Sequence, residues 1–280
     1  MHVIRWDLLE SSETKAYFLH ILNKAQGTAL TVGGFDGPHI GHQILFNSVL
    51  QNATSKKLVP GIVTFTKSPG AFKKPDHYSG DVSTLDLRLK KFAEYGFHFV
   101  ILIDFSGDFG KMSGGVFFDI LVKTAHMRYL AVGHDFRCGH RLDTGVAEIA
   151  ALSQREGFRF DSIGQVEIDG VRVSSSAIRK AVQSADFTRA EKLLGYPFLL
   201  DFMAPQWTVT DRLFKASRSE ITQILPQCGT YTAVLHTDAC QALCANAEIT
   251  ETQLLIFPSA GRKLPDVSSV QAVEFRLSSC

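Results

Sequence analysis

Short apolar runs alternate with segments of helical periodicity over the first two-thirds of the chain. Four such runs, rich in Val, Ile and Leu and bounded by Gly, Pro or Asp, have the pattern of buried parallel strands. They lie at Ala29–Val32, Leu58–Phe65, His98–Ile103 and Tyr129–Val132. Helices are predicted between or after them at Gly41–Asn52, Leu85–Tyr95, Ser113–Thr124 and Gly145–Glu156, the third with Ser113 as its cap. This order predicts an α/β fold with a Rossmann-like, doubly wound parallel sheet, whose ligands bind beyond the carboxyl ends of the strands.

The pattern changes at Gly195-Tyr196-Pro197, after a helical stretch over Ser176–Leu194. Beyond it the pieces are β-rich or alternate with period two, and only Ser217–Ile224 has a helical signal. The β pieces lie at Gln206–Thr210, Tyr231–His236, Glu251–Phe257 and Val270–Leu277. We therefore predict a first domain over residues 1–197 and a smaller, barrel-like β-rich domain over 198–280.

Composition narrows the class of protein. The 280 residues, 45% of them apolar, are enough to form a full hydrophobic core. A net charge of +1 gives no excess field for nucleic acid or an anionic membrane, so neither is expected as a partner. No signal-like N-terminus or long apolar segment is present, which predicts a cytoplasmic protein, and we expect a monomer. The five cysteines have no paired C-x-x-C spacing and are predicted to be reduced thiols in or near the core.

A loop rich in glycine and histidine follows the first predicted strand directly. It reads Gly33-Gly34-Phe35-Asp36-Gly37-Pro38-His39-Ile40-Gly41-His42. The glycines allow backbone N–H groups to approach a ligand closely, and the helix that begins near Gly41 directs its positive end to the same place. His39 and His42, three residues apart, can donate hydrogen bonds from one side of this turn. The loop therefore predicts a phosphate-binding site.

A second group of anion-binding residues precedes the last predicted helix of the first domain. Ser174, Ser175 and Ser176 can cap this helix and offer hydroxyl donors, and Arg179 adds a planar cation suited to a phosphate. A cap alone is the commoner role of such serines, but Arg179 and the histidine loop together favour a second phosphate clamp.

These motifs, in this order, resemble those of the H-I-G-H nucleotidylyltransferases, and in particular of bacterial FAD synthetases. The resemblance is carried by Gly34–His42, Val63–Phe65, Thr84–Phe92, Ala131–Arg137 and Gly170–Arg179, and it spans about Gly27 to Pro197. It implies transfer of AMP from ATP to FMN, which gives FAD and pyrophosphate.

The resemblance also implies roles for individual residues. The catalytic group would be His39, His42, Ser175, Ser176 and Arg179. ATP and its phosphates would be bound by Gly33, Gly34, Phe35, Asp36, Gly37, Gly41, Ser174 and Gly133. The flavin side would be bound by Phe65, Pro69, Asp135, Phe136 and Arg137. Mg²⁺ would bridge the substrate phosphates, so no protein ligand for a metal is assigned.

The chain departs from the family pattern in the two elements that meet the flavin or adenine. The family's T-F-x-P-H-P element reads Thr64-Phe65-Thr66-Lys67-Ser68-Pro69 and has lost its histidine, for which Lys67, Lys73 or Lys74 are possible electrostatic substitutes. The later element has Cys138 in place of its second phenylalanine. Two alternatives therefore stay open: an adenylyltransferase for another phosphorylated acceptor, and a flavin- or nucleotide-binding protein without catalysis.

The last 83 residues lack the motif of the riboflavin kinase module that follows this domain in most of the family. That module has a G-x-P-T-A-N element whose Thr and Asn serve Mg²⁺ and ATP. The corresponding stretch, Leu213 to Glu220, contains no such element, and the only asparagine after Gly195 is Asn246. We predict a shortened relic of the kinase barrel without kinase activity.

Overall fold

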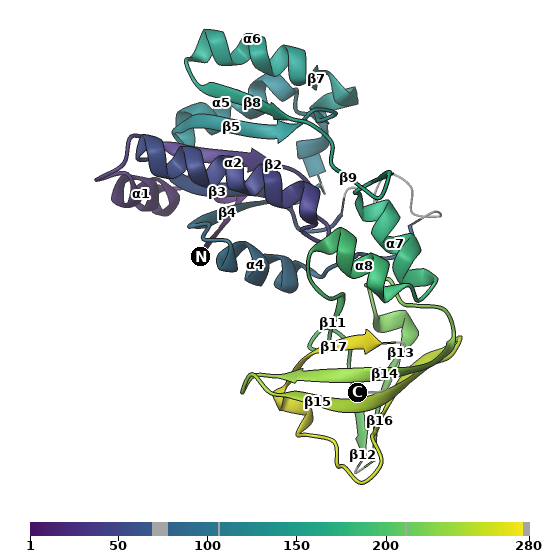
Figure 1. Cartoon of the computed structure of the whole chain (residues 1–280). Coiled ribbons are helices and arrows are strands. Elements are labelled where there is room, and N and C mark those ends of the chain that lie inside the picture. The colour runs from purple at the N-terminus through teal and green to yellow at the C-terminus, as the bar shows by residue number, and fades with distance from the viewer. Residues whose placement is uncertain (69–77, 106, 211, 277–280) are drawn as a thin grey trace. The chain divides into compact units, whose positions relative to one another are not determined.

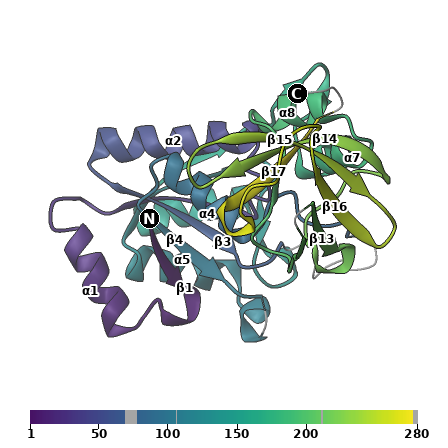
Figure 2. The same ribbon diagram turned by 90° about the horizontal axis from the view of Figure 1, so that it is seen from below.

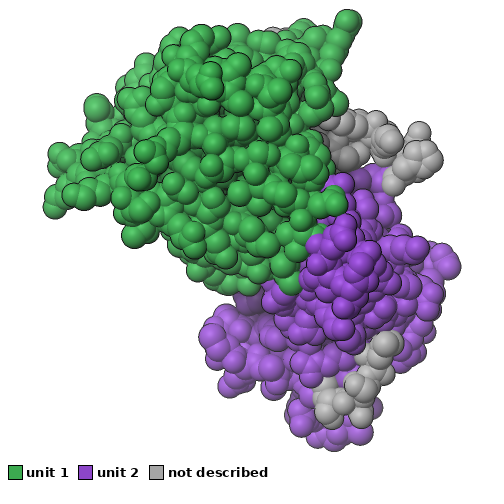
Figure 3. All heavy atoms as spheres, turned by 45° about the horizontal axis from the view of Figure 1, so that its top comes forward, with its two compact units in different colours: residues 1–75, 89–166 green, residues 76–88, 167–280 purple. Residues whose placement is uncertain are grey.

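The computed structural model describes residues 1–68, 78–105, 107–210 and 212–276. Internal packing divides the chain into two compact units. The first comprises Met1–Pro75 and Leu89–Val166, and the second comprises Asp76–Arg88 and Glu167–Cys280 (Figure 3). The domain boundary near Pro197 stays a prediction. Pro69, Lys73, Lys74 and Cys280 lie outside the described residues.

The first unit is built on a parallel sheet of six strands, which confirms the predicted Rossmann-like class (Figure 1). The strand order is β1-β4-β3-β2-β5-β8. The bounds are β1 His2–Arg5, β2 Thr28–Val32, β3 Val59–Phe65, β4 Phe99–Ile103, β5 Met127–Gly133 and β8 Arg159–Ile163. The chain winds outward from β2 through β3 to β4, then returns to β5 and continues to β8. The crevice of such a sheet lies where the winding direction reverses, beyond β2 and β5.

Helices cover both faces of this sheet because successive strand residues point to opposite sides. The bounds are α1 Ser12–Ile21, α2 Ile40–Lys56, α4 Leu85–Glu94, α5 Gly114–Thr124 and α6 Val146–Glu156. On one face, buried residues of α1, α5 and α6 join one hydrophobic cluster with alternate residues of β2, β4 and β5. Phe46 of α2 packs against Phe92 of α4 instead. Figure 2 shows α2 on one side of the sheet and α1 on the other.

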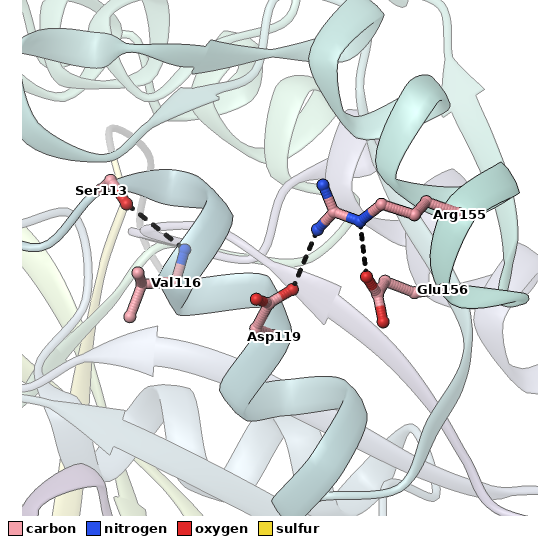
Figure 4. Close-up of polar contacts among 5 residues, drawn as sticks. All are labelled: Ser113, Val116, Asp119, Arg155 and Glu156. Atoms are coloured by element: carbon pink, nitrogen blue, oxygen red, sulfur yellow. Dashed lines mark hydrogen bonds and ion pairs between the residues drawn. The ribbon is translucent and has the colours of Figure 1, made fainter.

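Helices α5 and α6 contact each other through exposed polar side chains. Ser113 caps α5 by accepting the N–H of Val116 at 3.3 Å, as predicted. Arg155 of α6 binds both Asp119 of α5 and its own neighbour Glu156 (Figure 4). These exposed ion pairs contribute little stability, whereas Phe117, Phe118 and Leu121 of α5 are buried in the core.

The second unit consists of a short hairpin, two helices and a curled antiparallel sheet. The sheet order is β11-β17-β14-β15-β16-β13-β12, and the two end strands do not pair with each other. The bounds are β9 Glu167–Ile168, β10 Val171–Arg172, α7 Ser175–Gln183, α8 Phe187–Leu194, β11 Leu199–Asp201, β12 Thr208–Thr210, β13 Leu213–Ser217, β14 Gly229–Thr237, β15 Ala242–Ile249, β16 Gln253–Pro258 and β17 Val270–Arg276. The sheet confirms the predicted smaller β-rich part, and it is open rather than closed into a barrel.

Several sequence predictions need correction. The helical signal at Ser217–Ile224 was wrong, because only a short 3-10 turn over Arg218–Glu220 forms. The stretch Ser176–Leu194 is two helices, since Ala185 between them has a left-handed backbone with φ of 57°. Cys228 and Cys240 are exposed rather than in or near the core, although the four described cysteines are free thiols. The pattern also gave no signal for β1, α1, β8 or β15.

Candidate active site

The loop after β2 has a backbone that only certain residues can adopt. Phe35 is in the left-handed region with φ of 45° and is 2% exposed. Its ring lies 2.8 Å from the position that a Cβ on Gly33 would occupy, so a side chain at Gly33 would displace it. Gly37 also has a positive φ of 64°. The loop therefore folds back so that the Phe35 ring packs directly on Gly33 at the end of β2.

His39 and His42 lie together where α2 begins. His39 is the N-cap of the helix, and its Nδ1 accepts the backbone N–H of His42 at 3.3 Å. The two rings stack with centroids 3.6 Å apart and planes 14° from parallel. The predicted pairing at the helix start is confirmed, whereas the capping role of His39 was not foreseen. Since Nδ1 is an acceptor, a neutral His39 carries its proton on Nε2.

His42 is held as a neutral imidazole. Burial and the neighbouring His39 hold the pKa of His42 well below its ordinary value, against the opposing effect of a hydrogen bond to the Gly37 backbone. Its Nδ1 atom is buried and has no hydrogen-bond partner in the described part of the chain. One ring nitrogen of His42 is therefore buried without a described partner, close to the start of α2.

The low pKa of His42 predicts a pH-dependent stability. The unfolded chain binds a proton at His42 near pH 6.5, and the folded protein does so only at lower pH. The free energy of unfolding should thus be fully retained above pH 6.5 and fall as the pH drops below it. Urea titrations at pH 7, 6 and 5 should show a smaller loss in the His42→Asn variant than in the wild type. Equal losses of unfolding free energy in the variant and the wild type would show that His42 is not the source of the pH dependence.

A cavity of about 590 Å³ begins at the same loop. Its walls are mostly aromatic and aliphatic, and Phe65 and Phe105 stack within them at a centroid distance of 4.6 Å. The lining comprises Val32, Gly33, Gly34, Phe65, Phe105, Phe109, Gly110, Met112, Phe117, Phe136, Arg137, Cys138, Gly139, Arg141 and Leu142. The size and the few polar groups are typical of a pocket for a small organic ligand.

This cavity joins two groups of predicted residues and adds others. Gly33 and Gly34 of the phosphate loop line it together with Phe65, Phe136 and Arg137 of the predicted flavin side. Sequence reasoning missed further lining residues, namely Phe105, Phe109, Phe117 and Arg141. The spacing of phenylalanines over residues 105–118, directly after a predicted strand, was the available signal.

The wall formed by residues 137–145 is fixed by a small hydrogen-bond network. Asp143 Oδ1 accepts the N–H of Gly114 at 3.0 Å and the hydroxyl of Thr144 at 2.9 Å. The Arg137 side chain donates to the carbonyl oxygen of Leu142 at 2.8 and 3.1 Å. Burial and the neighbouring Asp143 raise the pKa of Cys138 to about 12, so this thiol stays protonated.

Asp135 and Gly133 do not line the cavity. Asp135 is exposed in the turn after β5, where the N–H of Phe136 binds the carbonyl oxygen of Gly133 at 3.0 Å. Their roles toward a substrate remain predictions.

The serine group and Arg179 belong to the second unit. Ser174 is the N-cap of α7 and accepts the N–H of Ala177 at 3.2 Å, which leaves Ser175 and Ser176 in the first helical turn. Arg179 donates from Nε to the carbonyl oxygen of Gly80 at 2.7 Å, and its guanidinium lies 5.1 Å from the centre of the Tyr78 ring. The histidine pair lies in the first unit, so joint action of the two groups stays a prediction.

Two features are absent from the described residues. No group of three or more His, Cys, Asp or Glu side chains within them is arranged to hold a metal ion. The same residues contain no helix that is long and apolar enough to span a membrane.

A glycine- and histidine-rich loop at the reversal point of a parallel sheet defines a nucleotide-binding α/β domain. A model of the FAD synthetase family matches residues 21–177. The chain belongs to the FAD synthetase family, which confirms the nucleotidyltransferase family predicted from the motifs.

Individual relatives agree with this assignment. The chain is 31% identical over 182 residues to a bifunctional riboflavin kinase/FMN adenylyltransferase of Haemophilus influenzae, and 31% over 185 residues to one of Escherichia coli K12. The matches cover 64% and 65% of this chain and 59% of each relative. A solved structure described as a macrolide-efflux protein from Streptococcus pneumoniae has a TM-score of 0.75 and 20% identity, with 98% of both chains covered. That likeness shows the fold of the whole chain, and the fold alone.

Proposed function

We propose that this protein is an FMN adenylyltransferase, which converts ATP and FMN to FAD and pyrophosphate. The observation that carries the proposal is the aromatic cavity that starts at Gly33 and Gly34, in the loop that ends at the histidine pair. A flat, apolar isoalloxazine ring suits stacked phenylalanine walls, and a phosphate suits the loop and the start of α2.

The chemistry needs no protein nucleophile. An oxygen of the FMN phosphate attacks the α-phosphorus of ATP, the bond from that phosphorus to the bridging oxygen breaks, and pyrophosphate leaves with the electron pair. The protein then has to align the two substrates and neutralise the charge that develops on the phosphates. His39 donates from Nε2. His42, whose ring stacks on that of His39, would contribute a second donor from the same turn.

Further residues are proposed to serve the same transfer. Ser175, Ser176 and Arg179 would bind phosphate oxygens as donors and as a cation. Mg²⁺ would be carried by the phosphate oxygens of ATP and would neutralise their charge.

The β-rich sheet is proposed to have no riboflavin kinase activity. Leu213–Ser217 forms the plain strand β13, and a 3-10 turn over Arg218–Glu220 follows it. Neither contains the Thr and Asn of the kinase element. An adenylyltransferase for another phosphorylated acceptor remains the second candidate, and the aromatic lining favours a flavin over an aliphatic acceptor. We further propose a cytoplasmic monomer.

One assay tests these proposals. Purified protein is incubated with ATP, Mg²⁺ and either FMN or riboflavin, the flavins are separated, and pyrophosphate is measured. FAD and pyrophosphate should appear in equal amounts from FMN, and riboflavin should stay unchanged. Binding of FMN without pyrophosphate release would favour a non-catalytic flavin protein, and FMN formed from riboflavin would disprove the loss of kinase activity.

A further inference from the structure

A segment that runs into the first turn of α4 is built into the β-rich unit. Residues 78–88 lie between strands β3 and β4 of the parallel sheet in sequence, yet they pack with the second unit. Asp81 forms a parallel bridge with Gln223. Its N–H donates to the carbonyl oxygen of Thr222 at 2.9 Å, and its own carbonyl oxygen accepts the N–H of Ile224 at 2.8 Å. The backbone of this segment thus extends the β-rich part.

The side chain of Gln223 holds this junction from inside. It is 4% exposed, and its Nε2 donates to the carbonyl oxygens of Val82 at 3.0 Å and Leu199 at 2.9 Å. Its Oε1 accepts the N–H of Asp201 at 2.7 Å. All hydrogens and the oxygen of the amide are therefore engaged, which leaves Gln223 a single orientation.

Asp201 adds a second connection to the same segment. Its carboxylate is 5% exposed and accepts the hydroxyl of Thr84 at 2.5 Å through Oδ2. Thr84 Oγ1 also accepts the N–H of Leu87 at 3.3 Å, in the first turn of α4. The other carboxylate oxygen, Oδ1, accepts the N–H of Met203 at 3.0 Å. The buried carboxylate of Asp201 in β11 thus holds Thr84, the residue directly before α4.

The segment in turn orients Arg179. The carbonyl oxygen of Gly80 accepts the Nε proton of Arg179 at 2.7 Å, and the Tyr78 ring lies beneath the guanidinium. Gly80 has φ of 114°, and a Cβ there would lie 2.8 Å from the backbone nitrogen of Ile224. A side chain at position 80 would therefore meet the β-rich part, and the Gly80 carbonyl lies two residues before Val82, which Gln223 binds.

We propose that Gln223 and Asp201 are positioning residues for adenylyl transfer. They hold residues 78–84 in place and, through the carbonyl of Gly80, set the orientation of the Arg179 guanidinium. The β-rich unit then has a structural role in orienting Arg179. This inference rests on the proposed function and on the role proposed there for Arg179.

The test compares Gln223→Leu with a control in the same sheet. Gln223→Leu removes the three hydrogen bonds and keeps most of the volume. Glu274→Gln removes a buried carboxylate whose partners, His236 and Arg276, belong to the sheet itself. Gln223→Leu should lower kcat for FAD formation roughly tenfold to a hundredfold, the range expected when a phosphate-binding group is displaced. Glu274→Gln should lower the Tm and leave kcat unchanged.

Two further measurements separate positioning from general destabilisation. The amide of Asp81 should exchange hydrogen faster in Gln223→Leu and at the wild-type rate in Glu274→Gln. Adding Gln223→Leu to Arg179→Ala should lower kcat no further, because the glutamine acts through the arginine. If Gln223→Leu does not fold, Thr84→Val, which removes the bond to Asp201, takes its place in both measurements.

The results separate a failure of the positioning role from a failure of the proposed function on which it rests. FAD formed by the wild type and by Gln223→Leu at equal rates would overturn the positioning role alone, as would a full additional loss in the double variant. No FAD from the wild type would overturn the proposed function and the positioning role together.

Discussion

Replacing His39 by alanine is expected to lower kcat for FAD formation by about 10²–10³-fold, the loss typical of removing one donor that stabilises transition-state charge. The Nε2 proton of His39 is directed away from the helix cap, because Nδ1 accepts the N–H of His42. The same substitution removes the N-cap of α2, which should cost about 1 kcal/mol of stability. Steady-state kinetics and urea unfolding of the same preparation measure both effects.

His39→Asn is the matched control for the cap. Asparagine is a good N-cap residue, so this variant should recover the stability that alanine loses. It lacks an imidazole Nε2 proton, so its kcat should stay low. If His39→Asn recovered both stability and turnover, His39 would be a structural cap and the proposed phosphate contact would be disproved.

Replacing Gly139 by alanine is expected to destabilise the protein by about 2–4 kcal/mol. Gly139 has φ of 80°, and a Cβ there would overlap Asp143 Oδ1 and the backbone nitrogen of Gly114. These are the two atoms whose hydrogen bond ties residues 137–145 to α5. The cavity wall would move, so KM for FMN should also rise. Thermal unfolding and the KM for FMN measure the two effects.

Gly157→Ala provides a control that also has a positive φ but has no crowding. Gly157 ends α6 with φ of 74°, and nothing lies within 4 Å of the position that a Cβ would occupy there. Alanine at this position should cost only about 1–2 kcal/mol for the left-handed conformation and leave KM for FMN unchanged. If the two variants lost equal stability and bound FMN alike, the contacts of Gly139 would not matter to the cavity.

The sequence was sufficient to predict the elements that have a strong local pattern. The strands before the histidine loop and after it follow from unbroken apolar runs, and the cap at Ser113 follows from its position before a helical period. The glycines of the loop are required by local backbone geometry at Gly33 and Gly37. Short edge strands such as β1, and the strand β15 with its mixed composition, have no comparable pattern.

The sequence by itself determined the parallel sheet, the glycine- and histidine-rich loop at the end of β2 and the family, because each depends on residues close together along the chain. Only the tertiary structure decided that Phe105, Phe109 and Phe117 line one cavity with Gly33. It also decided that residues 78–88 pack with the β-rich unit, and that Gln223 and Asp201 hold them there. The physical reason is that these contacts join residues far apart in sequence. Strand order and chain crossings bring such residues together, and no local pattern contains that information.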